Sequence, residues 1–240
     1  MSYQKPINLD EWILIKNRGA LVRTGAVYRS QDSKYILRTG GKDEIQNEAD
    51  FAQKLYHVGF PIPAPVERGE IDGEVSYFVE TSVGNKTFGE MFASDYRDIG
   101  KINDDLFKKF TETVKLFAVA QLDNSNRELE TIQLVEAIQL GNVLLENPDL
   151  PEDLINTAME KFKKRTNLLP VVISHGDFTP FNIMEGGVID FETRVMMPFG
   201  YDIVTGVVFQ KFWDHPKPNG SGTMKLWDFS NEQLTSYFDQ

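Results

Sequence analysis

The sequence predicts an α+β fold, with an antiparallel sheet and one helix in its N-terminal part and a mainly helical C-terminal part. Three observations predict it. The first part holds short runs of β-branched and aromatic residues that are separated by glycine or polar turns. One amphipathic stretch interrupts these runs, and after Gly84 the apolar residues repeat at helical spacing over long segments. We therefore expect two unequal lobes, residues 1–83 and 84–240, connected by residues 80–86.

Four segments of the first lobe are predicted strands, because each is rich in Val, Ile, Leu or aromatic residues and is bounded by turn-forming residues. They are residues 12–15, 21–30, 34–39 and 75–80. A helix is expected between the third and fourth strands, where Asp43 and Gln46 form a capping box and Gly59 ends the helix. Its apolar stripe consists of Ile45, Ala49, Ala52 and Leu55.

The second lobe is predicted to hold three long helices and a short one. Apolar residues at helical spacing place the long helices at residues 104–121, 128–146 and 151–166, and the short helix at 230–239. Pro151 opens the third helix. The residues expected to face inward from it are Leu154, Ile155, Ala158 and Phe162.

Composition excludes several function classes. The chain has 240 residues and no cysteine, so disulfide frameworks, thiolate metal sites and cysteine nucleophiles are excluded. No signal peptide and no membrane span are recognisable, which predicts a soluble cytoplasmic protein. The formal net charge of −11 argues against nucleic acid as a partner. The acid excess is explained first as a means of solubility, and it would also suit a cationic substrate.

The stretch ISHGDFTPFNIMEGGVIDFE, residues 173–192, gathers the polar residues that matter most. Asn182 and Asp190 are symmetric about Gly186, so a hairpin turning at Gly186 would bring them opposite one another. Amide and carboxylate oxygens suit Mg²⁺, which takes its other ligands from phosphate and water. Asp177 would stand on the preceding loop, where a carboxylate can accept the proton of an attacking hydroxyl.

The pattern H-G-D-x-x-x-x-N followed by I-D-F-E resembles the catalytic and metal-binding segments of the aminoglycoside phosphotransferase and choline kinase-like family. The resemblance implies a two-lobed protein kinase-like fold that uses ATP and Mg²⁺. It also implies that Asp177 is the catalytic base, that Asn182 and Asp190 bind the metal, and that His175 braces the loop. The interval from Asn182 to Asp190 is shorter than is usual in that family.

The same resemblance implies where the nucleotide binds. Glu48 lies on a core-facing helix stripe and needs a cationic partner. The implied partner is Arg38, at the position of the lysine that holds the α- and β-phosphates, with Lys34 and Lys42 as alternatives. Residues 17–25 would cover the phosphates.

Backbone groups near Glu80, Ser82 and Val83 would bind adenine, since residues 77–88 resemble the family's connecting segment. Residues 198–203 resemble another family segment, in which Asp202 anchors the catalytic loop.

We therefore expect an ATP- and Mg²⁺-dependent phosphotransferase acting on a hydroxyl of an aminoglycoside, a choline-like amino alcohol or a sugar. The alternative is a nucleotide-binding pseudokinase with a regulatory role, which Arg38 and the short hairpin favour. A protein kinase is less consistent, because Glu192 stands where D-F-G has its glycine. A cationic acceptor would suit Glu192, Asp214 and Asp228, although loop and packing roles are favoured for the last two.

Overall fold

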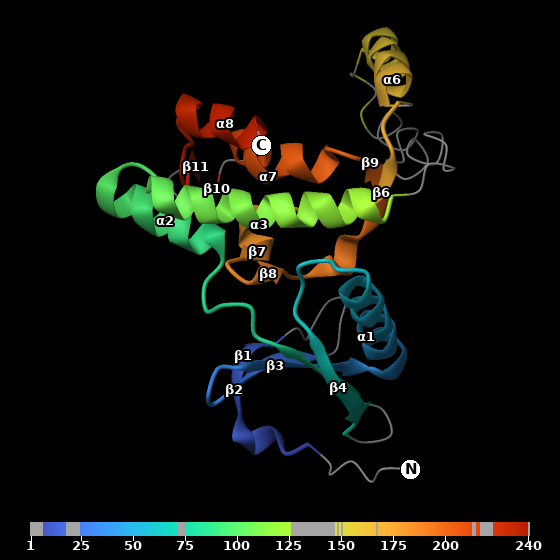
Figure 1. Cartoon of the computed structure of the whole chain (residues 1–240), viewed down its shortest axis with the longest axis vertical. Helices are drawn as coiled ribbons and strands as arrows, with labels where there is room; N and C mark the ends of the chain where they lie inside the picture. The colour runs from blue at the N-terminus through green and yellow to red at the C-terminus, as the bar shows by residue number, and fades with distance from the viewer. Residues whose placement is uncertain are drawn as a thin grey trace. The chain divides into compact units, whose positions relative to one another are not determined.

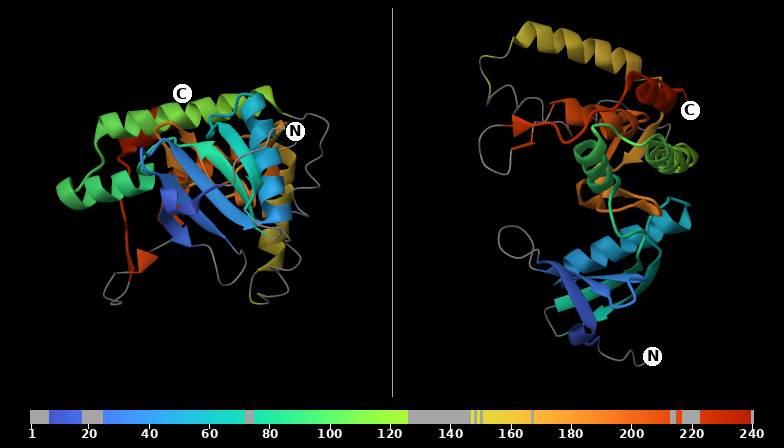
Figure 2. Two further views of the ribbon diagram at one scale, coloured as in Figure 1. Left: turned by 90° about the horizontal axis from the view of Figure 1, so that it is seen from below. Right: turned by 90° about the vertical axis from the view of Figure 1, so that its left-hand side faces the viewer.

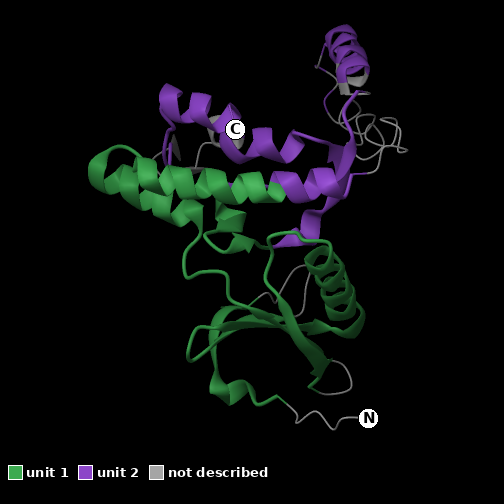
Figure 3. Ribbon diagram, viewed as in Figure 1, with its two compact units in different colours: residues 1–117, 180–189 green, residues 118–179, 190–240 purple. Residues whose placement is uncertain are grey.

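The computed structural model describes residues 7–17, 25–71, 75–125, 147, 149, 151–166, 168–212, 215–216 and 223–239. The chain forms two compact units that are not contiguous in sequence (Figure 3). Unit 1 comprises residues 1–117 and 180–189, and unit 2 comprises residues 118–179 and 190–240. The expected lobe boundary after residue 83 stays a prediction.

Unit 1 contains a five-stranded antiparallel sheet with the strand order β1-β2-β3-β5-β4 (Figure 1). Its strands are β1 (Trp12–Asn17), β2 (Ala26–Ser30), β3 (Tyr35–Gly41), β4 (Pro65–Glu70) and β5 (Val75–Thr81), preceded by the 3-10 turn η1 (Leu9–Glu11). β5 pairs on both sides, and all of its residues except the two terminal ones are buried. Each of the four predicted segments contains a strand, although β2 begins at Ala26 and residues 21–24 of the predicted segment 21–30 lie outside the described residues. β4 is an additional edge strand.

Helix α1 (Lys42–His57) lies along one face of this sheet (Figure 2). Ile45 and Ala49 are buried against Phe78 of β5, which confirms the predicted apolar stripe. The predicted capping box is wrong, because the helix already begins at Lys42 and its N-cap is Gly41, without a side-chain cap. On the opposite face, a second cluster forms around Leu37, Tyr77 and Val79.

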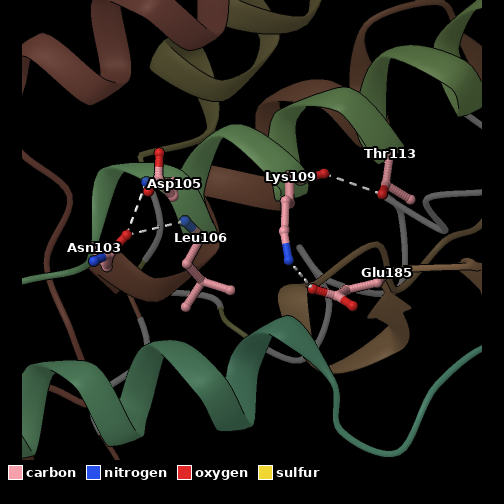
Figure 4. Close-up of polar contacts among 6 residues, drawn as sticks. All are labelled: Asn103, Asp105, Leu106, Lys109, Thr113 and Glu185. Carbon is pink, nitrogen blue, oxygen red and sulfur yellow. Dashed lines mark hydrogen bonds and ion pairs between the residues drawn. The ribbon is translucent and has the colours of Figure 1, made fainter.

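Phenylalanines join helices α2 (Phe88–Ile99) and α3 (Asp104–Asp123). The rings of Phe88 and Phe92 contact Phe110 at centroid distances of 5.5 and 5.3 Å, and all three are fully buried. Helix α2 was not predicted, whereas α3 was. Asn103 caps α3, since its side-chain oxygen accepts hydrogen bonds from the amides of Asp105 and Leu106 (Figure 4).

Unit 2 is built around a short antiparallel ladder and two packed helices. The ladder joins β6 (Val171–Ser174) to β9 (Val195–Pro198), so the polar segment between them leaves and re-enters the same two strands. The Tyr237 hydroxyl of α8 (Asn231–Phe238) donates to the carbonyl of Ile203 in α7 (Tyr201–Phe212) at 2.8 Å. The remaining elements are α6 (Glu152–Thr166), η3 (Phe191–Thr193), β10 (His215–Pro216) and β11 (Thr223–Met224).

The inward stripe predicted for α6 is wrong for two of its residues. Leu154 is 65% exposed and Ala158 is also exposed, while Ile155 is half-buried. The predicted helix at 128–146 lies outside the described residues. Among the helices that the structure describes, none is long and apolar enough to cross a membrane.

Candidate active site

A cavity of about 400 Å³ opens on the sheet of unit 1. Four of the residues predicted to bind nucleotide line it, namely Arg38, Glu80, Ser82 and Val83. Aliphatic side chains supply much of the rest of the wall: Ile13, Leu14, Ile15, Val27, Ile36, Val83 and Ile189. An apolar cavity with a few convergent charged groups is the usual form of a small-molecule site. Glu48, the fifth predicted residue, is half-buried on α1 and is not among the lining residues.

Arg38 and Glu80 form a hydrogen-bonded ion pair inside this cavity. The Arg38 Nε donates to Glu80 Oε1 at 2.9 Å, and only 13% and 7% of the two side chains are exposed. A buried guanidinium of this kind needs a carboxylate partner, because transfer of an unpaired charge from water is costly. Glu80 therefore contributes its side chain, whereas the sequence predicted a contribution only from its backbone.

The connection after β5 is held by backbone hydrogen bonds on both sides. The Ser82 amide donates to the Lys34 carbonyl at 2.7 Å, and the Val83 carbonyl accepts from Gly186 at 2.9 Å. These two groups are therefore engaged within the protein. A base bound here would use other polar groups of the connection, such as the carbonyl of Ser82 or the amide of Val83.

The register of the hairpin formed by β7 (Ile183–Met184) and β8 (Gly187–Val188) differs by one residue from the predicted register. Ile183 is opposite Val188, and the Ile189 amide donates to the Asn182 carbonyl at 2.9 Å. The turn is therefore centred between Glu185 and Gly186. The prediction that Asn182 lies opposite Asp190 is wrong, since the backbone of Asn182 pairs with that of Ile189.

Two close backbone approaches explain the pair of glycines in this hairpin. A Cβ on Gly186 would lie 2.7 Å from the Val83 carbonyl oxygen, and one on Gly187 would lie 2.5 Å from that of Pro61. The hairpin is further tied to α3, because Lys109 Nζ lies 2.8 Å from Glu185 Oε1 (Figure 4). Asn182 is the last residue of η2 (Pro180–Asn182). Because the hairpin is short, Asn182 lies close to its turn, which these contacts hold in place.

In unit 2, the loop that carries Asp177 is anchored by a buried carboxylate. Asp202 is 1% exposed and accepts three hydrogen bonds. They come from the hydroxyl of Ser174 at 2.7 Å, the amide of His175 at 3.0 Å and the side chain of Gln121 at 2.7 Å. Burial raises the pKa of Asp202, and these three bonds act against that rise. The anchoring role that the resemblance implied for Asp202 is confirmed.

His175 braces the same loop and is fully buried. Its Nδ1 lies 3.3 Å from the amide nitrogen of Asp177, which donates to it. Its ring packs 4.6 Å from that of Phe191, the residue after Asp190, and its carbonyl accepts from Thr193. The imidazole therefore links the backbone at Asp177 to the segment that follows Asp190, and a structural role for His175 is confirmed.

Asp177 differs from its neighbours in exposure, and Asp190 differs from its neighbours in backbone conformation. Asp177 is exposed although His175 and Phe178 beside it are fully buried. Asp190 has a left-handed backbone with φ of 67°, a conformation that aspartate tolerates better than most residues. The chain leaves the hairpin at this residue and enters η3. Asp177 is therefore accessible on a loop whose neighbouring residues are buried. Asp190 is half-buried and precedes Phe191, which packs on His175.

The donor chemistry of these residues fits magnesium. Among the described residues, no three His, Asp or Glu side chains lie together as a self-sufficient metal site. Mg²⁺ is commonly held by one or two protein oxygens and completed by water and phosphate. The amide oxygen of Asn182 and the carboxylate of Asp190 are each donors of this kind.

The family model of the phosphotransferase enzyme family matches residues 17–222. The chain belongs to this family. The match extends from the last residue of β1 to beyond α7, so strands β2 to β5, the hairpin and the anchored loop lie within it. No curated protein sequence matches this member of the phosphotransferase family significantly.

Solved structures of aminoglycoside phosphotransferases share its fold. APH(4)-Ia is 13% identical, with a TM-score of 0.56 over 96% of this chain and 77% of that one. APH(3'')-Id from Streptomyces rimosus, in complex with ADP and streptomycin, is 13% identical, with a TM-score of 0.53 over 95% and 84%. The type VIII aminoglycoside-3'-phosphotransferase is 18% identical, with a TM-score of 0.51 over 95% and 84%. The predicted kinase-like α+β fold is therefore confirmed.

The remaining predicted residues concern the phosphate-covering loop and the acceptor side. Residues 18–24 of the expected phosphate-covering loop and Asp214 lie outside the described part of the chain. Glu192 is exposed, and Asp228 lies 3.2 Å from Lys225 on the surface. Neither arrangement indicates an acceptor site.

Sequence reasoning missed Arg29 and Gln121. Arg29 lines the cavity, and its Nε is buried without a hydrogen-bond partner among the described residues. Gln121 is 1% exposed and connects Asp202 with the Ile173 carbonyl. A glutamine on the apolar face of a predicted helix was the available signal for Gln121, because a buried amide needs partners.

Proposed function

We propose that this chain is an ATP- and Mg²⁺-dependent phosphotransferase that phosphorylates a hydroxyl group of a small molecule. One observation carries the proposal: an exposed Asp177 on a loop that Asp202 and His175 hold by buried hydrogen bonds. Phosphoryl transfer depends on positioning and charge stabilisation more than on covalent chemistry of the protein. A solvent-accessible carboxylate on a rigid loop suits the deprotonation of an acceptor hydroxyl.

The division of roles follows from the chemistry of each group. Asp177 would orient the acceptor hydroxyl and take its proton. The cavity lined by Arg38, Glu80, Ser82 and Val83 would receive the nucleotide, with the aliphatic wall against its base. Asn182 and Asp190 would hold Mg²⁺, which neutralises charge on phosphate oxygens when bound. Glu48 is proposed as an additional carboxylate near Arg38.

The acceptor class is proposed from charge and from the family. The net charge of −11 suits a cationic acceptor, such as an aminoglycoside or a choline-like amino alcohol, and sugars are included as neutral candidates. A solved structure with the same fold was determined with streptomycin, an aminoglycoside. The decisive experiment is a phosphoryl-transfer screen over these three classes with Mg²⁺ and ATP. Product from one class supports the proposal, whereas nucleotide binding without turnover on any acceptor favours a pseudokinase.

The metal role has its own test. Replacing Asp190 by Ala should weaken Mg²⁺-dependent ATP binding by about tenfold, because one of two protein ligands is lost. The control is Asp98→Ala, which removes an exposed carboxylate of α2. Equal titration curves for wild type and Asp190→Ala would contradict the assignment.

A further inference from the structure

The charged pair in the cavity of unit 1 joins two neighbouring strands. β3 and β5 are antiparallel, and their register sets Ile36 opposite Glu80 and Arg38 opposite Phe78. Residues two apart on a strand share a face, so Arg38 and Glu80 are diagonal neighbours on the face that lines the cavity. The contact is therefore built into the sheet register.

The carboxylate is held in place by the backbone around it. The Thr81 amide donates to the Ala64 carbonyl at 2.9 Å, and the Thr81 hydroxyl accepts from the Ala64 amide at 2.9 Å. The Ser82 amide is bonded to Lys34 on the other side. Glu80 thus lies at the end of β5, where hydrogen bonds to Ala64 on one side and Lys34 on the other hold the backbone.

The atom that Glu80 contacts is informative. Arginine donates from Nε as well as from its two terminal nitrogens, in a rigid planar fork. A bond to Nε fixes the plane of the guanidinium and does not use the terminal donors. Lysine has a single terminal ammonium, so the atom that paired with Glu80 would also be the atom needed by a ligand.

We propose that Glu80 is a positioning residue: it holds Arg38 by Nε so that the terminal guanidinium nitrogens address the phosphates of a bound nucleotide. This contact also explains why arginine occupies a position where the family resemblance implies lysine. The inference rests on the proposed function, because it concerns how the same cavity binds its nucleotide. In this proposal, Glu80 acts on the phosphates through Arg38 and not by its own contact with them.

The test is calorimetric titration of ATP and ADP into purified full-length variants, together with steady-state kinetics. Glu80→Ala and Arg38→Lys should each raise the Kd for ATP about tenfold and raise KM more than they lower kcat. Glu80→Gln should bind within about threefold of wild type, since an amide oxygen still accepts from Nε. The double variant should lose no more than either single variant, because both changes remove the same contact.

Arg68→Lys is the matched control. Arg68 of β4 forms an exposed ion pair with Asp50 of α1, and it does not line the cavity. This variant should leave ATP binding unchanged. A structural role for Glu80 alone would lower thermal stability without changing the Kd of the folded protein.

The outcomes separate this inference from the proposed function. If wild type binds ATP and folded Glu80→Ala binds it within twofold of wild type, the inference is overturned and the function survives. If the effects of Arg38→Lys and Glu80→Ala multiply in the double variant, the positioning relation is also overturned. If wild type binds no nucleotide, both the inference and the proposed function fail.

Discussion

Asp202 shows how a single buried carboxylate can determine the course of a functional loop. It accepts hydrogen bonds from Ser174, His175 and Gln121, which come from the end of β6, the loop and α3. A carboxylate offers acceptor sites only, so three converging donors match it well. Its burial carries a cost in solvation that the three bonds offset.

Replacing Asp202 by Ala should lower the free energy of unfolding by about 3 kcal/mol, because three buried donors would lose their acceptor. Asp202→Asn should cost less. Its oxygen can accept from His175 and Gln121, and its amide group can donate to the Ser174 hydroxyl. Urea unfolding of the two variants checks the order, and equal losses would contradict the network.

A comparison of wild type with Asp202→Asn tests the direction of the pKa shift of Asp202. Burial raises this pKa above that of the unfolded chain. The stabilising contribution of Asp202 is therefore complete below the ordinary aspartate pKa and is lost as the pH rises through the raised value. The stability of wild type minus that of Asp202→Asn should accordingly fall across this range. A difference that stays flat, or rises with pH, would contradict the shift.

Gly176 is the residue whose side-chain absence the loop needs most. Its φ is +83°, and a Cβ there would lie 2.1 Å from the Thr193 carbonyl oxygen. Gly176→Ala should destabilise the protein by about 3 kcal/mol or more, since strain and a backbone clash add.

Gly100→Ala provides the matched comparison for Gly176. Its φ is +72° with open space around the Cβ position, so only the backbone strain applies and about 1 kcal/mol is expected. Denaturant titration of both variants measures the difference. Similar losses would show that the contact with Thr193 relaxes.

At the scale of elements, runs of β-branched and aromatic residues predicted four strands, and the helical repeat of Ile45, Ala49 and Leu55 predicted α1. β4 escaped prediction since it begins with Pro65, contains Gly69 and exposes most of its residues as an edge strand. For α6 the prediction of a buried stripe was wrong, because the stripe is apolar in sequence but Leu154 is exposed. Periodicity shows that a face is apolar and does not show what covers it.

The hairpin and Glu80 show the corresponding limits for the site. The sequence predicted a turn at two glycines, yet its register was off by one position, because symmetry alone cannot distinguish a two-residue turn from a three-residue turn. Glu80 at the end of a buried apolar strand signalled a cationic partner by the argument used for Glu48. The sequence therefore predicted residues that line the cavity, but the ion pair of Arg38 with Glu80 depends on the strand register, which the sequence did not predict.

Helix α2 carries a capping box that marks its start. The Thr87 hydroxyl accepts from the Glu90 amide at 3.2 Å, and Glu90 accepts from the Thr87 amide at 2.7 Å. Thr87→Ala should cost about 1 kcal/mol of stability, whereas Thr87→Ser should be nearly neutral because it retains the hydroxyl. Thermal unfolding checks this, and equal shifts for both variants would contradict a capping role.

At the scale of the whole molecule, the proposed residues come from both compact units. The cavity and Asn182 belong to unit 1, whereas Asp177 and Asp190 belong to unit 2. The chain passes from unit 2 to unit 1 and back between Asp177 and Asp190, because residues 180–189 belong to unit 1. Activity assays therefore require the full chain, because neither unit contains every proposed group.

The most direct test of the proposed function compares wild type with Asp177→Asn in Mg²⁺- and ATP-dependent phosphoryl transfer to an acceptor found by the screen. Asparagine retains the size of the side chain and removes its basicity. We predict that kcat falls by at least about 100-fold, while ATP binds the variant as it binds wild type. Turnover of Asp177→Asn equal to that of wild type would contradict the assignment of Asp177 as the base.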